Sequence, residues 1–215
     1  MFTRKNLLVT VALSWLVIVD PTQAASIFIS NFSFEEPPVG DGVTSTLTVS
    51  QAADTAIPGW GAYTPAGMTV GVREAKYATD GIQIAVVNGT GDGIYQDVGA
   101  LLPNAIYTLA VSNLLIPNNR FASLGISLFN GPDPSAPLLG SFGVSSDDPV
   151  GDVIVTFPSP ASASGDLTIF LFAVDDFGSE FDNVRLSATP EPSSCVLFGL
   201  GVIGLYAMVR RRTRS

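Results

Sequence analysis

The residue types that most often perform catalysis or bind metals are nearly missing from this chain of 215 residues. The sequence has no histidine and a single cysteine, Cys195. Histidine is the usual general base near neutral pH and the commonest zinc ligand. Serine–histidine–aspartate and cysteine–histidine chemistry are therefore excluded.

Two pairs of adjacent acids, Asp147-Asp148 and Asp175-Asp176, are the groups that a polysaccharide hydrolase would use. Hydrolytic carboxyl groups flank the scissile bond from separate elements, and one of them needs an apolar pocket that raises its pKa. Neighbours within one segment point to opposite sides of the chain, so we interpret both pairs as solvated turn acids. A secreted, carboxylate-dependent polysaccharide hydrolase stays the alternative function.

Four aromatic side chains, Trp60, Tyr63, Tyr77 and Tyr95, are candidates for a ligand-binding platform. Flat apolar ring faces suit the C–H faces of sugar rings, and aromatic residues line many ligand sites. Trp60 follows a Pro-Gly turn, a position that also suits a core residue at the end of a β-sandwich. We predict a ligand-binding role for Trp60, Tyr63 and Tyr95, with a core role as the alternative for Trp60.

The part of the chain between its two apolar ends is strongly acidic. Residues 25–189 contain 17 of the 19 acids and four of the ten bases, which gives this part a net charge of −13. Nucleic acid requires a basic footprint, so it is excluded as a partner. The acidity favours solubility, and it is compatible with calcium or with neutral ligands such as sugars.

Residues 1–24 predict a secretory signal peptide. Arg4 and Lys5 form a basic start, the apolar stretch 7–19 follows, and small residues precede a cleavage position after Ala24. The apolar stretch is too short and wrongly flanked for a spanning anchor. We therefore expect the chain to be exported.

Residues 189–215 predict a membrane-inserted tail. Pro190-Glu191-Pro192 precedes an uncharged stretch at 193–209, which as a helix rising about 1.5 Å per residue is just long enough for a bilayer. By the positive-inside rule the bases that follow stay cytoplasmic and the preceding domain lies outside. These bases are Arg210, Arg211, Arg212 and Arg214.

This order of features resembles the PEP-CTERM sorting signal of exported proteins in Gram-negative bacteria that make exopolysaccharide. The resemblance implies a membrane protease, exosortase, that recognises Pro190, Glu191 and Pro192 and releases the domain from its helix. It also implies an inner-membrane-anchored precursor with a periplasmic domain, which then reaches the cell surface or extracellular matrix. A permanently membrane-anchored envelope protein is the alternative.

Between the two ends, short β-branched and aromatic runs alternate with Gly, Pro, Asn and Asp. Tyr107, Leu109 and Val111, for example, share one face of a run with period two, which is typical of a strand with one buried side. We predict an all-β domain over residues 25–188, an antiparallel β-sandwich or jelly roll. The expected strands cover residues 26–32, 46–49, 69–72, 82–87, 94–98, 106–112, 125–129, 138–142, 153–157, 167–174 and 181–187.

Several short motifs of this domain resemble the galactose-binding-like jelly rolls found in many carbohydrate-binding modules. Asn31-Phe32-Ser33-Phe34-Glu35 follows the first strand, Ile57-Pro58-Gly59-Trp60 comes next, and the run from Phe181 to Leu186 closes the domain. The resemblance implies that the first and last strands are neighbours and that a structural Ca²⁺ lies between Glu35 and Asp182. Paired carboxylates need a cation or a proton, and Ca²⁺ prefers oxygen ligands. The alternative is that both are solvated turn carboxylates.

These features together predict a non-enzymatic exported protein of the cell surface or extracellular matrix. The expected role is glycan binding or adhesion. The expected partners are an exosortase-type protease, the membrane before processing, and exopolysaccharide or another glycan.

Overall fold

A computed structural model describes residues 23–39, 44–47, 57–75, 78–113, 123–144, 151–175 and 178–191 of the protein. The predicted hydrophobic helix at 193–209, the four C-terminal arginines and nearly all of the predicted signal peptide lie outside these residues. So do Pro192, Tyr77, Asp147, Asp148 and Asp176.

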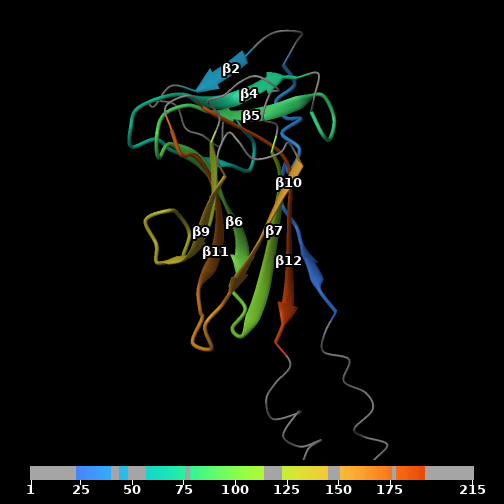
Figure 1. The fold of residues 1–215 in the computed structure, drawn as a ribbon, viewed down its shortest axis with the longest axis vertical. Helices are drawn as coiled ribbons and strands as arrows, with labels where there is room; N and C mark the ends of the chain where they lie inside the picture. Colours follow the sequence, from blue (N-terminus) through green and yellow to red (C-terminus); the bar gives the residue numbers. More distant parts are fainter. Residues whose placement is uncertain are drawn as a thin grey trace, which may run out of the picture. The chain divides into compact units, whose positions relative to one another are not determined.

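The described residues form two β-sheets. Sheet A has seven strands in the order β10 (Gly151–Pro158), β7 (Ala105–Asn113), β12 (Ser179–Pro190), β5 (Gln83–Val87), β4 (Val70–Glu74) and β2 (Thr44–Leu47), and β1 (Ala25–Ile27) also pairs with β12. Sheet B has five strands in the order β3 (Gly61–Tyr63), β6 (Gly93–Ala100), β11 (Asp166–Ala173), β8 (Leu124–Asn130) and β9 (Leu138–Val144). Figure 1 shows β6, β9 and β11 on one side and β7, β10 and β12 on the other.

The predicted all-β antiparallel sandwich is confirmed by this arrangement. Every expected strand is present, with ends that differ by a few residues. β3 was not expected, because three residues are too few for a period-two pattern to be recognised. The expected first strand at 26–32 is wrong in length, since β1 ends at Ile27 and the chain turns away at Asn31 and Phe34, both with positive φ.

One continuous core lies between the sheets. β7 contributes Tyr107, Leu109 and Val111, as the sequence predicts, and β11 contributes Ile169 and Leu171 from the opposite sheet. Both sets alternate with residues that face away from the core, as period two requires. The two sheets therefore bury one face each against the other.

Contacts divide the chain into two units, residues 25–188 and residues 1–24 with 189–215. The sandwich accounts for the first unit. Among the described residues, no helix is long and apolar enough to cross a membrane. The membrane helix and the signal peptide stay predictions.

Trp60 closes the core beneath the segment that follows β1. Its side chain is 0% exposed, its ring lies 5.3 Å from that of Phe34, and its Nε1 donates hydrogen bonds to the carbonyl oxygens of Ser30 and Asn31. The indole thus fills space and also satisfies backbone carbonyls of the adjacent arch. The core alternative is the one that the structure supports for this residue.

We predict that Trp60→Phe lowers the free energy of unfolding by about 2–4 kcal/mol. The change removes core volume and the indole N–H, whereas the carbonyls of Ser30 and Asn31 each keep another donor, Gln96 Nε2 and the Phe34 amide. Urea unfolding of the protein purified from its host measures the loss, with Tyr63→Phe as the control. An unchanged midpoint for Trp60→Phe would contradict the structural role of the indole.

Candidate functional site

The outer face of sheet B carries an unusual number of aromatic side chains. The second half of strand β11 is apolar on both sides: Ile169 and Leu171 enter the core, whereas Phe170 and Phe172 alternate with them and point away. A solvent-facing sheet surface normally carries polar residues at such positions. Outward-facing phenylalanines are therefore the informative feature of this strand.

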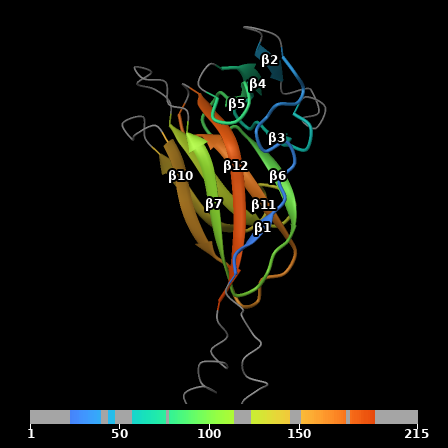
Figure 2. The ribbon, with the colours of Figure 1, turned by 90° about the vertical axis from the view of Figure 1, so that its right-hand side faces the viewer.

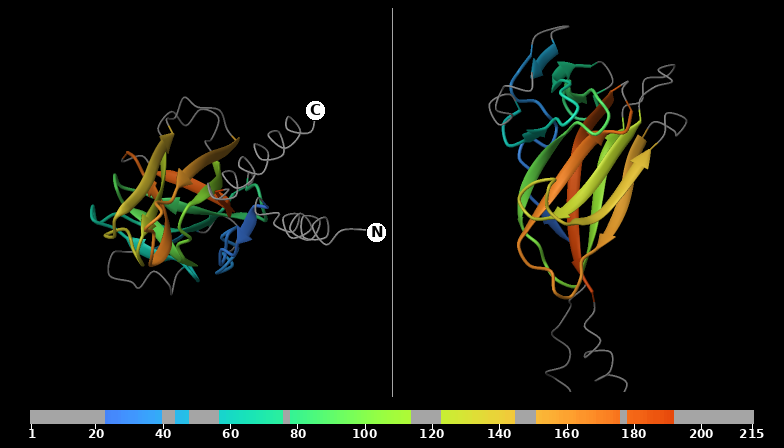
Figure 3. Two further views of the ribbon diagram at one scale, coloured as in Figure 1. Left: turned by 90° about the horizontal axis from the view of Figure 1, so that it is seen from below. Right: turned by 90° about the vertical axis from the view of Figure 1, so that its left-hand side faces the viewer.

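Strand register places these rings among neighbours on the same face. Tyr95 pairs with Phe170, and Phe170 pairs with Ser127 on β8. One row along the strands, Tyr63 pairs with Gly93 and Gly93 with Phe172. The right panel of Figure 3 views the sandwich from the side of sheet B, where β6, β8 and β11 lie next to one another.

The rings contact one another. Phe170 stacks on Phe172 with centroids 5.1 Å apart and an interplanar angle of 9°, and it meets Tyr63 and Phe129 edge-on at 5.7 Å and 6.1 Å. Phe170 is only 6% exposed, whereas Tyr63 is 40% exposed. We call the surface formed by Tyr63, Tyr95, Phe129, Phe170 and Phe172 the aromatic face.

Glycines on neighbouring strands allow the rings to lie flat against the sheet. A Cβ atom at Gly61 would lie 2.5 Å from the Tyr95 ring, one at Gly93 would lie 2.4 Å from the Phe170 ring, and one at Gly125 would lie 2.2 Å from the Phe172 ring. Any side chain at these positions would push the rings outward. The sequence thus builds a low, broad apolar surface rather than separate projecting rings.

Polar groups border the aromatic face. Ser127 and Ser141 share a hydroxyl hydrogen bond of 2.8 Å, and Thr168 donates to the carbonyl of Gly131 at 2.6 Å. Asp97 pairs with Thr168 in register and is exposed, and its Oδ1 accepts the amide of Gly99 at 2.9 Å. An apolar platform with a polar rim is the usual composition of a recognition surface.

Of the predicted ligand residues, the structure brings Tyr63 and Tyr95 onto this face and places Trp60 in the core. Sequence reasoning missed Phe129, Phe170 and Phe172. The available signal was the uninterrupted apolar run of β11, in which both faces are apolar and one of them must be outward. Binding at Tyr63 and Tyr95 stays a prediction.

The second predicted site, Glu35 with Asp182, holds the loop between β4 and β5. Glu35 Oε1 accepts the amides of Ile82 and Gln83 at 2.9 and 2.7 Å. Asp182 Oδ2 accepts the amides of Thr79 and Asp80 at 2.5 and 2.9 Å. The two acids thus bind successive parts of one loop.

Gly81 lets this loop approach the acids closely. Its φ is +78°, a conformation that favours glycine, and a Cβ atom on it would lie 2.3 Å from the Glu35 carboxyl carbon. Asp182 also accepts the amide of Asn183 through Oδ1 at 2.7 Å. The expectation that the first and last strands meet also holds, since β1 pairs with β12 in antiparallel register.

Burial raises the pKa of Asp182 to about 6. Loss of hydration is the main cause, the amides of Asp80, Thr79 and Asn183 act in the opposite direction, and the nearby charge of Asp80 adds to the increase. The side chain is 0% exposed. This carboxyl group therefore changes its protonation state near neutral pH.

The amides fit poorly with a Ca²⁺ ion at this place. Oε1 of Glu35 and Oδ2 of Asp182 each already accept two N–H groups, whose positive hydrogens occupy the positions that a cation would take. In the part of the chain that the structure describes, no group of three or more acidic, histidine or cysteine side chains is placed to hold a metal. Calcium binding stays a prediction of the sequence.

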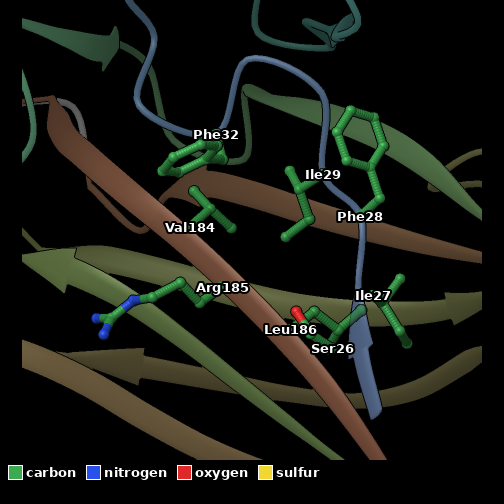
Figure 4. A pocket seen from close by; sticks show the side chains of 8 residues that line it. All are labelled: Ser26, Ile27, Phe28, Ile29, Phe32, Val184, Arg185 and Leu186. Carbon is green, nitrogen blue, oxygen red and sulfur yellow. The ribbon is translucent and has the colours of Figure 1, made fainter.

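A small hollow lies at the opposite sheet, between β12 and the segment after β1. Its volume is about 260 Å³, and it is lined by Ser26, Ile27, Phe28, Ile29, Phe32, Val184, Arg185 and Leu186. Figure 4 shows the guanidinium of Arg185 turned away from Ile27 and Ile29, and this group pairs with Asp152 at 2.6 Å. The hollow is thus mainly apolar and has few polar groups to orient a ligand.

The sorting motif begins where the sandwich ends. Pro190 is the last residue of β12, and both Pro190 and Glu191 are exposed. The motif therefore starts in extended backbone, the conformation that proline favours in its neighbours.

Comparison with known proteins assigns both parts of the chain. A family model described as "HpiC1 cyclase" matches residues 25–187, the whole sandwich. This chain belongs to the HpiC1-like family. A model of the PEP-CTERM protein-sorting motif matches residues 188–212, so the chain is an exported protein that is processed at the membrane. No curated protein matches the sequence significantly.

One solved structure shows the same fold for the HpiC1-like domain, and two further structures match it less well. The apo form of a cyclase from Fischerella sp. matches with a TM-score of 0.60 and 24% identity over 79% of this chain and 98% of that one. The xylan-binding module CBM15 matches with a TM-score of 0.45 and 14% identity over 69% and 98% of the two chains. The CBM22-1 xylan-binding domain of Paenibacillus barcinonensis Xyn10C matches with 0.43 and 14% over 68% and 94%.

This domain thus shares its fold with a cyclase, and a fold does not determine what a domain binds or converts. The family description and one relative contain the word cyclase. A non-catalytic role for this chain is therefore a proposal. It has to be argued from the surfaces that this chain presents.

We predict that Asp182 makes the stability of the domain fall between about pH 4 and pH 6. Its folded pKa of about 6 lies above the ordinary value of 3.8, so the folded state binds the proton more tightly than the unfolded state. The stabilisation is complete below pH 4 and is lost as the pH rises through 6, by about 3 kcal/mol in total.

Unfolding free energies of the wild type and of Asp182→Asn, measured from pH 4 to 7, test this dependence. The difference between the two proteins should change in favour of the Asn variant as the pH rises. Asp97→Asn, at an exposed acid, is the control and should follow the wild type. Parallel profiles for wild type and Asp182→Asn would contradict the raised pKa.

Proposed function

We propose that this protein is a non-catalytic glycan-binding module of the bacterial cell surface or extracellular matrix, delivered there by its sorting tail. The aromatic face of sheet B is its binding surface. The tail is recognised by an exosortase-type protease, and the sandwich remains with the exopolysaccharide after cleavage. This role combines export, an acidic domain and a cluster of aromatic rings on one sheet in a single chain.

The single observation that carries the proposal is the arrangement of the aromatic face. Five rings lie on adjacent strands, and they are kept low against the sheet by glycines. Such a surface is costly in water unless it has a partner. A pyranose ring offers a flat C–H face with hydroxyl groups at its edge, and it fits rings that are bordered by Ser127, Ser141 and Thr168.

The other outer surface differs in its chemistry. On sheet A, Arg185 pairs with Asp152, and Arg73 pairs with Glu180. Asp152 also accepts the hydroxyl of Ser112 at 2.8 Å. Sheet A also exposes Ile106 and Ile154, but these are aliphatic, whereas sheet B gathers aromatic rings, which supports sheet B as the binding side.

A second candidate is catalysis, which the family description favours. With no histidine in the chain, a cyclase would need a carboxyl group as its acid, and the pKa of Asp182 is raised to about 6, a suitable value for that role. This side chain is fully buried beneath the 79–82 loop, so a substrate would reach it only after that loop moves. Asp182→Asn would abolish such an activity and leave binding at the aromatic face intact.

We predict that Phe172→Ala and Tyr63→Ala each weaken glycan binding about tenfold or more, because ring contact supplies most of the affinity of such surfaces. Affinity electrophoresis in gels that contain the host's exopolysaccharide measures the loss. Phe28→Ala is the matched control, since Phe28 is 84% exposed but lies in the segment after β1, away from sheet B. Equal retardation of all three variants and the wild type would contradict the proposal.

We predict that processing removes both ends of the chain. Intact mass measured on host fractions should show, outside the inner membrane, a species that lacks residues 1–24 and everything beyond the Pro190–Pro192 region. Glu191→Ala should shift the protein to a membrane fraction that retains the arginine tail. A wild-type protein found with its tail in the membrane would establish a permanent anchor.

A further inference from the structure

The charges around the aromatic face have one sign. Asp97 and Asp166 lie on β6 and β11 and are exposed. The loop that follows β8 adds Asp133, whose pKa is held below its usual value by hydrogen bonds from Ser135. This loop joins β11 directly, because the amide of Gly131 donates to the carbonyl of Asp166 at 2.7 Å.

The bases lie elsewhere. Within the described ranges, Arg73 and Arg185 are the basic residues, and they belong to β4 and β12 of sheet A, where each forms an ion pair with an acid. Neither arginine ion pair involves Asp97, Asp133 or Asp166. A polymer of uronic acids or sulfated sugars would be repelled from this surface.

Geometry places one of these acids within reach of a stacked sugar. Asp97 follows Tyr95 by two residues on the same face of β6, a separation of about 7 Å along a strand. A sugar ring stacked on Tyr95 would thus have its edge substituents near the Asp97 carboxylate. Of the two Asp97 oxygens, Oδ1 accepts the Gly99 amide, and a carboxylate has further lone pairs for a charged donor.

We propose that the aromatic face selects a glycan with free amino groups, a partly de-N-acetylated amino-sugar polymer, whose ammonium groups pair with Asp97 and Asp166. This inference rests on the proposed function, because it names the sugar chemistry that the same face takes. Ring stacking supplies the contact area, and the acidic border supplies the choice among glycans. Electrostatic complementarity of this kind acts mainly on specificity and association rate.

The test compares three sets of oligosaccharides of equal length with the protein purified from its host: glucosamine oligomers, their N-acetylated forms, and galacturonic acid oligomers. Calorimetry at a pH at which the amines are charged should show about tenfold tighter binding of the glucosamine oligomers than of the neutral ones. The advantage should shrink as salt is raised, because exposed ion pairs are screened. Galacturonic acid oligomers should bind most weakly.

The double variant Asp97→Asn with Asp166→Asn should lose this preference and keep the affinity for neutral oligomers. Glu36→Gln, which removes a charge from an exposed acid outside sheet B, is the control and should keep the preference. Equal binding of charged and neutral oligomers by the wild type, or a preference that survives in the double variant, overturns the inference. In both cases binding that depends on Phe172 would leave the proposed function standing, whereas no binding by any oligomer overturns both.

Discussion

The loops at one end of this sandwich bury backbone amides and carbonyls, and each buried group must find a partner inside the protein. Side chains on the strands provide these partners. Asp92 accepts the amides of Ala66 and Met68, and Gln96 binds both the amide and the carbonyl of Ser30 as well as the carbonyl of Gly59. The remaining structure depends on this buried polar network, because long loops without such partners would not hold a fixed path.

The network also determines where the aromatic face begins. β3 has only three residues, and it pairs with β6. Gln96 fixes Gly59 just before this strand, and Asp92 fixes the loop just after it. Tyr63 therefore occupies its place above Gly93 because backbone groups on both sides of β3 are bound. Before β3 the Gly59 carbonyl accepts a hydrogen bond from Gln96, and after it the amides of Ala66 and Met68 donate to Asp92.

Much of the fold could be predicted from the sequence, because apolar residues with period two, as in residues 106–112, identify strands with one buried side. The outward aromatic positions of β11 could not, because a run that is apolar on both sides gives no alternation and does not show which residues face the core. The sequence predicted that Glu35 and Asp182 lie in the same region of the fold, but it did not predict which groups their carboxylates bind. Backbone amides carry no sequence signal, so a carboxylate that binds amides cannot be distinguished in sequence from one that would bind a cation.

The chain shares its fold with a cyclase, and the difference between a binding module and an enzyme then depends on where each chemical group lies. The carboxyl group of Asp182, whose pKa is raised, is covered by the loop that it holds, and its hydrogen bonds go to that loop and to its own strand. The groups that are open to a partner are rings and unshielded acids on sheet B.

A group that must stay bound to keep a loop in place is poorly placed to exchange protons with a substrate, because each turnover would release the amides it holds. Aromatic rings on a rigid sheet hold no loop in place, so they can bind a polymer without any change in the fold. The difference between a carboxyl group that holds a loop in place and side chains that are exposed to a partner therefore favours binding over catalysis for this domain.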